Sequence, residues 1–580
     1  MSRTQRGTRF TTPASLQPTR PHGGLQRIMG RQSKLVALSA LLICCSGLTG
    51  PMPVAFTASS PGSAPQQHPT SAAVVTFHVA NQQTGASDGN PGTDRLPLKT
   101  VGRAAEIAVA NNARGVPTAV VVHAGRYREA IAIRAQTPAA ITFQAAEKGA
   151  VILTGSDAWT DWQLLRPGVY RHAWPYRWGV APIPREWPAV QEIARRREMI
   201  FVNGRLLTQV LSQAAVTEGA FYVDEQAGWV YIWPPAGIDM TRATVEVAIR
   251  PSLFTASGPN LTIRGLTFEH AATFLDGDAV EVSGGANVLI EDTEYRWNNW
   301  GGLSIQASTD VIVRRSVANY NGGLGMGNWR NKNLLYEDNE TSFNNWRGVW
   351  GGFFDWAMGG IKNMRAHGGI WRRHKSVANQ AYGLWFDSDN QDVVVEDSVL
   401  CNNRLPGLFL EASQGPITVV RSTLCNNERA GVYGNGAEQV MLKNNIFYHN
   451  GVAQIELGGS KVRGGVDNWE TKQIRGLRDQ YWTLCGNAVV GLTPDAQGPG
   501  WGLSVPNWPW FLTTLKSSSN TWWNSKTVTI FRVADSQELD LVGWQRLTGQ
   551  DANSIFADPR LSGPDPGGLA PDARSPWKPC

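Results

Sequence analysis

Between residues 298 and 450 the apolar positions recur with a long period. The repeated unit begins with Asn, places Gly four residues later and continues with alternating apolar and polar residues. It occurs at Asn298/Gly302, Asn319/Gly323, Asn344/Gly348, Asn379/Gly383, Asn403/Gly407 and Asn427/Gly431, and Asn450 opens another turn. Successive Asn residues are 21, 25, 35, 24, 24 and 23 positions apart. Such periods, with Val-rich and Ile-rich strands and no helical pattern, predict a parallel β-solenoid.

Alternation within each repeat assigns an inward and an outward set of side chains. The residue after each Gly is apolar and predicts one buried column, formed by Leu303, Leu324, Val349, Leu384, Leu408 and Val432. The second and fourth positions after Gly must then point outward. The second position places four exposed aromatic residues on consecutive coils, Trp350, Trp385, Phe409 and Tyr433, and the fourth places Asp387, Glu411 and Asn435 in succession.

The rest of the chain is organised around this solenoid. Leu98–Ala110 has the pattern of an amphipathic helix, which we expect to cap the open end of the first coils. Residues 157–250 interrupt the rhythm with many Trp and Pro and a hairpin-like pair of β segments. The predicted organisation is a leader at 1–58, a disordered linker at 59–73, an N-terminal cap with the first coils at 74–156, an inserted β subdomain at 157–250, the main β-helix at 251–535 and a packed tail at 536–580.

The formal net charge of +6 originates in the leader. Residues 1–58 hold seven basic residues and no acidic one, whereas the remainder holds 46 basic and 47 acidic residues. This balance gives no reason to expect nucleic acid or an anionic membrane as a partner. Basic residues followed by the apolar run Leu35–Leu48 predict a secretion signal, with no transmembrane domain after its removal. We therefore expect a secreted monomer, extracellular or periplasmic; a lipid anchor at Cys44 or Cys45 is the less favoured alternative.

Four cysteines follow the leader. Cys401 and Cys425 occupy matching Leu-Cys-Asn-Asn segments one coil apart, and Cys485 and Cys580 come later. Stacked cysteines are close enough for a disulfide, but buried free thiols are the favoured interpretation. The cysteines show none of the C-x-x-C spacing that is typical of a zinc site.

Several segments carry a resemblance to a known group of proteins. They are Asp88-Gly89-Asn90-Pro91-Gly92-Thr93, Leu98-Lys99-Thr100, the segment from His123 to Glu129, the coils, and the tail from Asp551 to Pro559. Together they resemble secreted right-handed parallel β-helix proteins of the pectate-lyase-like superfamily, over most of residues 74–560. The resemblance implies an all-β fold and polysaccharide lyase, glycoside hydrolase or uronate epimerase activity. The catalytic signature of polygalacturonases is not matched, since Ala366-His367-Gly368-Gly369 only faintly echoes it.

Two adjacent outward carboxylates are the first set of candidate catalytic residues. Asp387 and Glu411 are predicted to lie side by side on neighbouring coils, where one can act as acid and the other as base or nucleophile. The aromatic track and Asn435 suit the binding of a glycan chain. Stacked aromatics and exposed carboxylates also occur in solenoids that bind no ligand. The column Glu337, Arg372 and Glu396 is such a case, and we predict that it forms salt bridges.

A second candidate set comes from the long interval between Asn344 and Asn379. About eleven extra residues, assigned to Gly351–Gly369, predict a loop beside the aromatic track that carries Trp356, Lys362, Arg365 and His367. Trp356 would bind substrate, while Lys362, Arg365 and His367 suit β-elimination on a uronic acid. Asp387 and Asp389 are possible Ca²⁺ ligands; no other cofactor is required. The favoured function is a glycoside hydrolase acting on a polysaccharide, with a polysaccharide lyase and a non-catalytic glycan-binding solenoid as alternatives.

Overall fold

The structure is a computed structural model, and it describes residues 73–458, 462–491, 500–506, 508–563 and 568–580. The predicted leader at 1–58 and the linker up to residue 72 lie outside the described residues, so the secretion signal stays a prediction. Among the described helices, none has the length and apolar character needed to cross a membrane.

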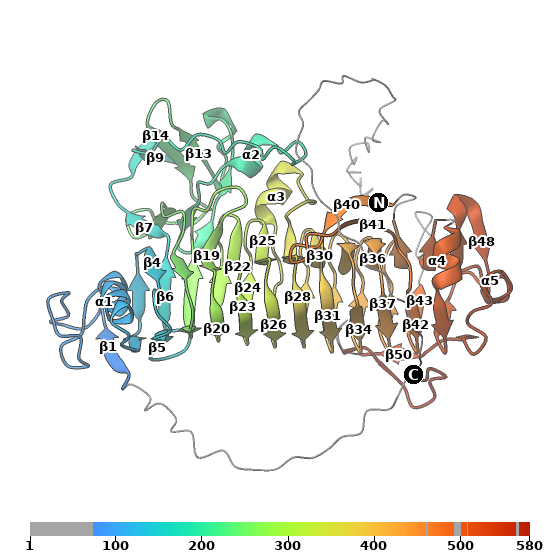
Figure 1. Cartoon of the computed structure of the whole chain (residues 1–580). Helices are drawn as coiled ribbons and strands as arrows, with labels where there is room; N and C mark the ends of the chain where they lie inside the picture. Colours follow the sequence, from blue (N-terminus) through green and yellow to red (C-terminus); the bar gives the residue numbers. More distant parts are fainter. Residues whose placement is uncertain (1–72, 459–461, 492–499, 507, 564–567) are drawn as a thin grey trace, which may run out of the picture. The chain divides into compact units, whose positions relative to one another are not determined.

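Residues from Val75 onward wind into a parallel β-helix whose coils follow one another along its axis (Figure 1). Two long sheets, each of 13 strands, form most of its wall. In what we call sheet 2, all strand pairs are parallel except the last. Its strands in spatial order are β4 (Ile131–Arg134), β16 (Phe254–Ser257), β19 (Asp278–Ser283), β22 (Gly301–Gln306), β25 (Leu324–Trp329), β27 (Gly359–Met364), β30 (Tyr382–Asp387), β33 (Leu408–Ser413), β36 (Ala430–Ala437), β39 (Ala453–Leu457), β44 (Trp501–Val505), β47 (Phe531–Val533) and β48 (Gln537–Leu539).

The other long sheet, sheet 1, begins at the N-terminal strand and ends near the C-terminal coils. Its strands are β1 (Val75–Val79), β2 (Thr118–Val122), β5 (Ile141–Ala145), β17 (Leu261–Arg264), β20 (Ala286–Glu291), β23 (Thr309–Arg314), β26 (Lys332–Glu337), β28 (His367–Arg372), β31 (Gln391–Glu396), β34 (Ile417–Val420), β37 (Val440–Lys443), β42 (Thr483–Cys485) and β45 (Lys516–Ser518). A third wall consists of short strands in two sheets, of five and seven strands.

A ladder of buried asparagines fixes how each coil stacks on the next. The side-chain N–H₂ of each Asn donates to the side-chain oxygen of the Asn one coil later, at 2.8–3.2 Å, through Asn298, Asn321, Asn344, Asn379, Asn403, Asn427 and Asn450. A buried amide is costly unless it is paired, so this ladder favours one stacking register. The predicted repeat of Asn is therefore structural in origin.

The predicted buried column is correct at four of its six positions and wrong at two. Leu303, Met326, Ile361, Leu384, Leu408 and Val432 are in register and fully buried, so Met326 and Ile361 stand where Leu324 and Val349 were expected. The sequence around Asn319 offers two overlapping Asn/Gly pairs, and the structure uses Asn321/Gly325 instead of Asn319/Gly323. A Cβ at Gly325 would lie only 2.6 Å from the carbonyl oxygen of Gly360, so the closely stacked turn requires glycine there.

The extra residues of the long interval after Asn344 also lie at a different place in the coil from the predicted one. The extra residues are 345–358, and they contain helix α3 (Trp346–Gly351) and a loop ahead of β27. The predicted loop at Gly351–Gly369 is therefore wrong in its second half, which forms β27 and the start of β28. Trp350 lies in α3, where its ring packs at a tilt against Trp346 with 4.7 Å between the ring centres, so it is not part of an aromatic column on sheet 2.

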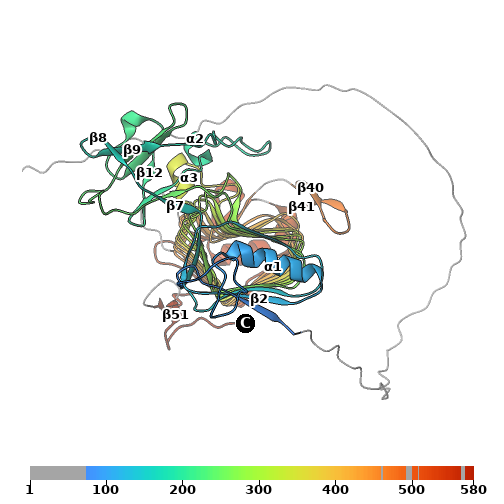
Figure 2. The ribbon, with the colours of Figure 1, turned by 90° about the vertical axis from the view of Figure 1, so that its left-hand side faces the viewer.

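The predicted capping helix is present as α1 (Val101–Ala113), three residues later than expected, and it crosses the open N-terminal end of the β-helix (Figure 2). Thr100 caps it by accepting a hydrogen bond from the backbone N–H of Arg103. The Glu129 carboxylate accepts from the backbone N–H groups of Val101 and Gly102, which have no partner within the helix. These contacts place the start of the helix after Leu98.

The inserted segment from β7 (Ser156–Trp159) to β15 (Val245–Ala248) forms two mostly antiparallel sheets with their own apolar core. Helix α2 (Glu192–Arg195) of this inserted segment packs against α3. Arg347 of α3 is fully buried against the inserted segment. Its guanidinium donates to Gln209 Oε1 at 2.6 Å and to the Glu198 carbonyl at 2.8 Å. Burial lowers the pKa of Arg347 to about 9.

Two disulfides connect the four described cysteines. Cys401 and Cys425 lie on neighbouring coils with their Cα atoms 4.5 Å apart, and Cys485 is bonded to Cys580. The expectation of free thiols at Cys401 and Cys425 is therefore wrong. The C-terminal segment also carries α4 (Pro509–Thr514) and α5 (Leu541–Thr548), and its strand β49 (Ile555–Phe556) pairs with β46 (Thr521–Asn524) of the coils.

Candidate active site

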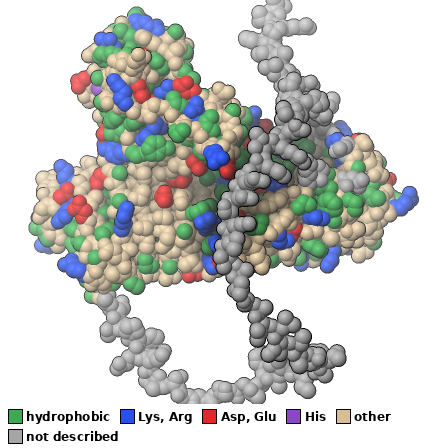
Figure 3. All heavy atoms as spheres, turned by 45° about the horizontal axis from the view of Figure 1, so that its top comes forward, with side chains coloured by type: hydrophobic (Ala, Val, Ile, Leu, Met, Phe, Trp, Pro, Cys, Tyr) green, Lys and Arg blue, Asp and Glu red, His purple; other side chains and the backbone are tan. Residues whose placement is uncertain are grey.

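A groove of two adjoining pockets lies on the outer face of sheet 2, where the inserted segment stands beside the coils (Figure 3). The smaller pocket, of about 310 Å³, spans strands β27, β30, β33 and β36. The larger, of about 530 Å³, extends towards β19. Trp356, Lys362 and Asp387 line both pockets, so the two form one continuous groove.

Asp387 and Glu411 stand next to each other in the smaller pocket. They are register partners on β30 and β33, as the repeat predicted, and their side chains are 17% and 13% exposed. Lys362 of β27 forms an ion pair with Asp387 at 2.9 Å. Arg463 forms an ion pair with Glu411. Each carboxylate therefore has its own cation, and both open into the same pocket.

The pKa of Glu411 is raised to about 7. Burial is the main cause, because it removes water from the charged form, and the negative charge of Asp387 adds to it. Arg463 and Lys362 act in the opposite direction without cancelling the effect. At neutral pH a large share of Glu411 is thus protonated beside a second carboxyl group, which is the arrangement that acid–base catalysis requires.

The aromatic residues beside this pair form a packed stack and not an exposed track. Trp385 and Phe409 are only 3% and 4% exposed, and their rings stack at 5.2 Å under Tyr382. Tyr433 continues the stack at 4.9 Å from Phe409 and is half-buried. The prediction that Trp385 and Phe409 are exposed is therefore wrong, although all three predicted residues of this stack line the pocket.

The loop after α3 forms one wall of the pocket. Trp356 is 39% exposed, and its carbonyl accepts a hydrogen bond from Lys362 Nζ at 3.0 Å. The neighbouring Asp355 carboxylate accepts from the Tyr382 hydroxyl at 2.8 Å. The ammonium group of Lys362 also lies 3.7 Å from the centre of the Trp385 ring. Lys362 is thus fixed by a carboxylate, a carbonyl and an aromatic face.

Two arginines complete the opposite wall. Arg463 belongs to the hairpin of β40 (Arg463–Asp467) and β41 (Ile474–Leu477), which is inserted between coils. Arg429 lies over the Tyr433 ring and pairs with Glu456 at 3.1 Å. Asn435, predicted to bind substrate, lines the same pocket next to Glu411. The pocket therefore contains three cations, each matched by an acidic side chain.

The larger pocket contains a second pair of acidic groups, Asp276 and Asp278. Asp276 is open to the groove but has protein on its other sides, and this burial raises its pKa to about 6. Burial, with the neighbouring Asp276 and Glu281, raises the pKa of Asp278 well above its ordinary value. Trp187 of the inserted segment closes this end and packs near Trp300 at 5.9 Å.

Arg365 and His367 lie away from the groove. Arg365 pairs with Asp467 at 2.7 Å, and His367 bridges Glu470 at 3.0 Å and Asp389 at 3.2 Å. These contacts fasten the β40–β41 hairpin to the coils. Neither residue is among those that line the two pockets, so the proposed elimination set of Lys362, Arg365 and His367 is not assembled at one place.

The possible Ca²⁺ ligands also face different partners. Asp389 is fully buried and accepts from the backbone N–H of Trp469 at 2.6 Å and from Gln391 at 2.8 Å, whereas Asp387 faces Lys362. Within the described residues, the one group of three side chains with metal-binding geometry lies elsewhere, at His78, Asp94 and His123.

Sequence reasoning missed six groups of the groove: Asp355, Tyr382, Arg429 and Arg463 in the smaller pocket, and Asp276 and Asp278 in the larger one. Arg429 lies two residues after the ladder residue Asn427, but the equivalent positions on the two preceding coils are Leu405 and Ala381, so the repeat gave no signal for a cation there. Arg463 and Asp355 come from insertions that have no counterpart on other coils, so no periodicity could place them.

Comparison with known proteins agrees with this architecture. Residues 228–352 and 350–447 match the family described as "Right handed beta helix region". No match is found among curated proteins. The structure titled "The complex structure of XylC with xylose" is similar with a TM-score of 0.63 at 16% identity, over 84% of this chain and 87% of that one.

A second similar structure is the Azotobacter vinelandii mannuronan C-5 epimerase AlgE4 A-module, with a TM-score of 0.44 at 12% identity, over 83% of this chain and 100% of that one. The family match, the similarity to the first structure and the stacked parallel coils agree with one another. The chain therefore has the right-handed parallel β-helix fold that its sequence predicted.

Proposed function

We propose that the chain is a glycoside hydrolase in which Asp387 and Glu411 cleave a glycosidic bond. The observation that carries this proposal is the placement of the two carboxyl groups as register partners in one pocket, with the pKa of Glu411 raised to about 7 by burial and by Asp387. A protonated acid beside an ionised carboxylate is the pair that glycoside hydrolysis uses.

Each residue then has a distinct role. Glu411 donates its proton to the glycosidic oxygen as the leaving group departs, while Asp387 attacks the anomeric carbon and forms a covalent glycosyl ester. Glu411, now ionised, takes a proton from water, which hydrolyses the ester and frees Asp387. Lys362 is a positioning residue, because its ion pair at 2.9 Å fixes the Asp387 carboxylate beside Glu411.

Retention of anomeric configuration is the stereochemical outcome that this geometry favours. Neighbouring parallel strands are about 4.8 Å apart, and retaining enzymes place their carboxyl groups about 5–5.5 Å apart. Inverting enzymes need about 6.5–9.5 Å to admit a water molecule. The volume of about 310 Å³ also lies within the range of small-ligand pockets.

The substrate class is an oligosaccharide or polysaccharide. Trp356 is the large aromatic side chain of the pocket with the most exposed surface, and it can stack on a sugar ring. The similar structure titled as a complex with xylose supports neutral, xylose-containing substrates as the first choice to test. Elimination on a uronic acid is the less favoured alternative, because Lys362, Arg429 and Arg463 are already paired with Asp387, Glu456 and Glu411.

The test is to incubate the protein separately with aryl glycosides, xylose-containing oligosaccharides and uronic-acid polysaccharides. New reducing ends without ultraviolet-absorbing products indicate hydrolysis, and the anomeric form of the first product, read by NMR, gives the stereochemistry. Unsaturated products that absorb in the ultraviolet would instead establish elimination. Binding to a glycan with no product at all would leave the solenoid as a binding protein and overturn the proposal.

A further inference from the structure

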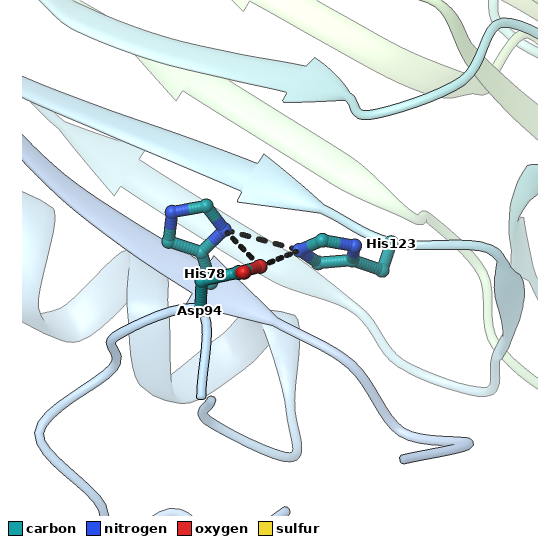
Figure 4. Close-up of side chains that lie close together, drawn as sticks. All are labelled: His78, Asp94 and His123. Atoms are coloured by element: carbon teal, nitrogen blue, oxygen red, sulfur yellow. Dashed lines mark hydrogen bonds and ion pairs between the residues drawn. The ribbon is translucent and has the colours of Figure 1, made fainter. Parts of the chain in front are cut away.

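A cluster of three potential metal ligands lies at the N-terminal edge of the β-helix, on the first two strands of sheet 1 (Figure 4). His78 is the fourth residue of β1, and His123 directly follows β2, its parallel neighbour. Asp94 comes from the loop between β1 and α1. Figure 4 shows the two imidazole rings turned towards each other with the Asp94 carboxylate beside both.

The distances between the three ligand atoms match the edges of a coordination polyhedron. His78 Nδ1 is 3.0 Å from His123 Nε2, and Asp94 Oδ1 is 3.5 Å from the first and 3.6 Å from the second. Bonds of about 2.0–2.1 Å in a tetrahedral zinc site place neighbouring ligand atoms about 3.3–3.4 Å apart. One small shift of the two rings would therefore let all three atoms bind one ion, with a fourth position left for water.

Backbone hydrogen bonds hold the three residues in place. The N–H of His78 donates to the Gly92 carbonyl at 2.7 Å, and its carbonyl accepts from the N–H of Leu98 at 2.9 Å. The N–H of His123 donates to the Val79 carbonyl at 2.8 Å. The loop that carries Asp94 is thus attached at both ends to the strand that carries His78, so the ligands are arranged in advance.

The chemistry of the cluster selects the class of ion. Two imidazole nitrogens and one carboxylate oxygen suit Zn²⁺ and neighbouring transition metals, whereas Ca²⁺ and Mg²⁺ prefer a set made of oxygens. The His78, Asp94 and His123 side chains are 24%, 73% and 33% exposed, so an ion can enter from solvent without unfolding of the coils.

We propose that His78, Asp94 and His123 form a zinc site that fastens the loop between β1 and α1 to the first two strands. An ion held by all three would bind the native N-terminal cap and not the unfolded chain, so it would stabilise the end of the solenoid. The site is independent of the proposed hydrolase function, since it shares no residue with the groove.

The test uses the full chain without a histidine tag, freed of metal by a chelator and titrated with ZnCl₂ against a coloured zinc indicator. We expect one bound equivalent in the wild type and at least about tenfold weaker binding in His78→Gln, His123→Gln and Asp94→Asn. His449→Asn is the matched control, because it removes a half-buried histidine outside the cluster and should leave the affinity unchanged.

A second readout separates binding from damage to the fold. Zinc should raise the melting temperature of the wild type and of His449→Asn, but not that of the cluster variants. Asp94→Asn keeps the site testable if a histidine variant folds poorly, because the Asp94 side chain is 73% exposed. A wild type that binds no stoichiometric zinc, or a His78→Gln/His123→Gln double variant that binds it undiminished, would overturn the proposal.

Discussion

Acidic side chains lie on the outer faces of both long sheets of the solenoid, but the pKa is shifted in opposite directions in the two places. On sheet 1, Glu291 is bonded to Arg264, Arg314 and Arg315 at 2.5–2.7 Å. Although burial opposes it, these hydrogen bonds lower the pKa of Glu291. On sheet 2, the pKa of Glu411 is raised to about 7.

The difference lies in what each carboxylate meets on the neighbouring coil. Sheet 1 alternates the sign of its charges, and the predicted column is confirmed by contacts of Arg372 with Glu337 at 3.3 Å and with Glu396 at 2.7 Å. Sheet 2 instead places Asp387 in register with Glu411, in a pocket that excludes much of the water. A neighbouring like charge adds to the effect of burial and raises the pKa of a carboxyl group, whereas neighbouring cations lower it.

The largest effect should come from the carboxylates of the pocket. Glu411→Gln and Asp387→Asn should each lower kcat by about 10²–10⁴-fold, because each removes a proton donor or nucleophile while keeping the shape of the side chain. Steady-state kinetics on the best glycoside of the panel measures this. The matched control is Glu396→Gln on sheet 1, in the same coil as Asp387, which should keep wild-type turnover. Wild-type activity in Glu411→Gln would show that Glu411, like Glu396 on sheet 1, has no part in the reaction.

Replacement of the buried ring next to the pair should affect stability most. Trp385→Ala should lower the free energy of unfolding by about 3–5 kcal/mol, because the ring is only 3% exposed and would leave a cavity in the stack. Denaturant unfolding measures the change. Tyr320→Asn is the control: Tyr320 stacks at 5.0 Å on Trp297 but is 39% exposed, and Asn tolerates its left-handed backbone. The free energy of unfolding of Tyr320→Asn should fall by no more than about 1.5 kcal/mol. Equal losses would contradict the assignment of Trp385 to the core.

The raised pKa of Glu411 should set the alkaline limit of activity. Because the acid must hold its proton, kcat/KM should fall as pH rises through about 7. Arg463→Gln removes a cation that lowers this pKa, so the alkaline limb should move to higher pH. Arg421→Gln, the corresponding change on sheet 1, should leave the profile in place. A profile with no alkaline limb near neutrality would refute the proton-donor role of Glu411.

The raised pKa of Glu411 also predicts how the free energy of unfolding depends on pH. Native Glu411 keeps a proton that the unfolded chain releases above about pH 4.3, so its contribution to stability falls between that pH and about 7. Glu411→Gln should reduce this fall, and urea unfolding at several pH values between 4 and 8 measures it. Unchanged pH dependence in the variant would assign the titration to another group.

The smallest effect is expected on the ladder of sheet 1. Hydrogen bonds from Arg315 and Lys148 lower the pKa of Asp292 to about 2, so its stabilising charge is complete above about pH 4 and is lost as the pH falls towards 2. Asp292→Asn should cost about 0.2–1 kcal/mol at pH 7, the range of a solvent-accessible ion pair. The difference from the wild type should vanish near pH 2 in urea titrations, and a larger cost at neutral pH would show that this ladder is more than a surface feature.

The fold and the pairing of the two carboxylates followed from the amino-acid sequence alone. The Asn residues recur at the coil length, because each buried amide must be paired with the next one. In a parallel stack, residues one coil length apart in the sequence are neighbours in space. Counting along the repeat was therefore enough to place Asp387 beside Glu411. The counting failed at Asn319, where two overlapping Asn/Gly pairs fit the local pattern and only the stacking of the neighbouring coils selects Asn321.

The surroundings of Asp387 and Glu411 depend on how distant segments pack together. Lys362 reaches Asp387 because the insertion lies ahead of β27 and not across it, and Arg463 reaches Glu411 from a hairpin with no counterpart on other coils. The burial of Trp385 likewise depends on Tyr382 and Phe409 covering it. The cysteines gave no indication of zinc, and His78, Asp94 and His123 meet only when β1, β2 and the loop before α1 come together. Periodicity fixes neighbours within the repeat, whereas the partners from insertions and loops depend on how the chain packs outside it.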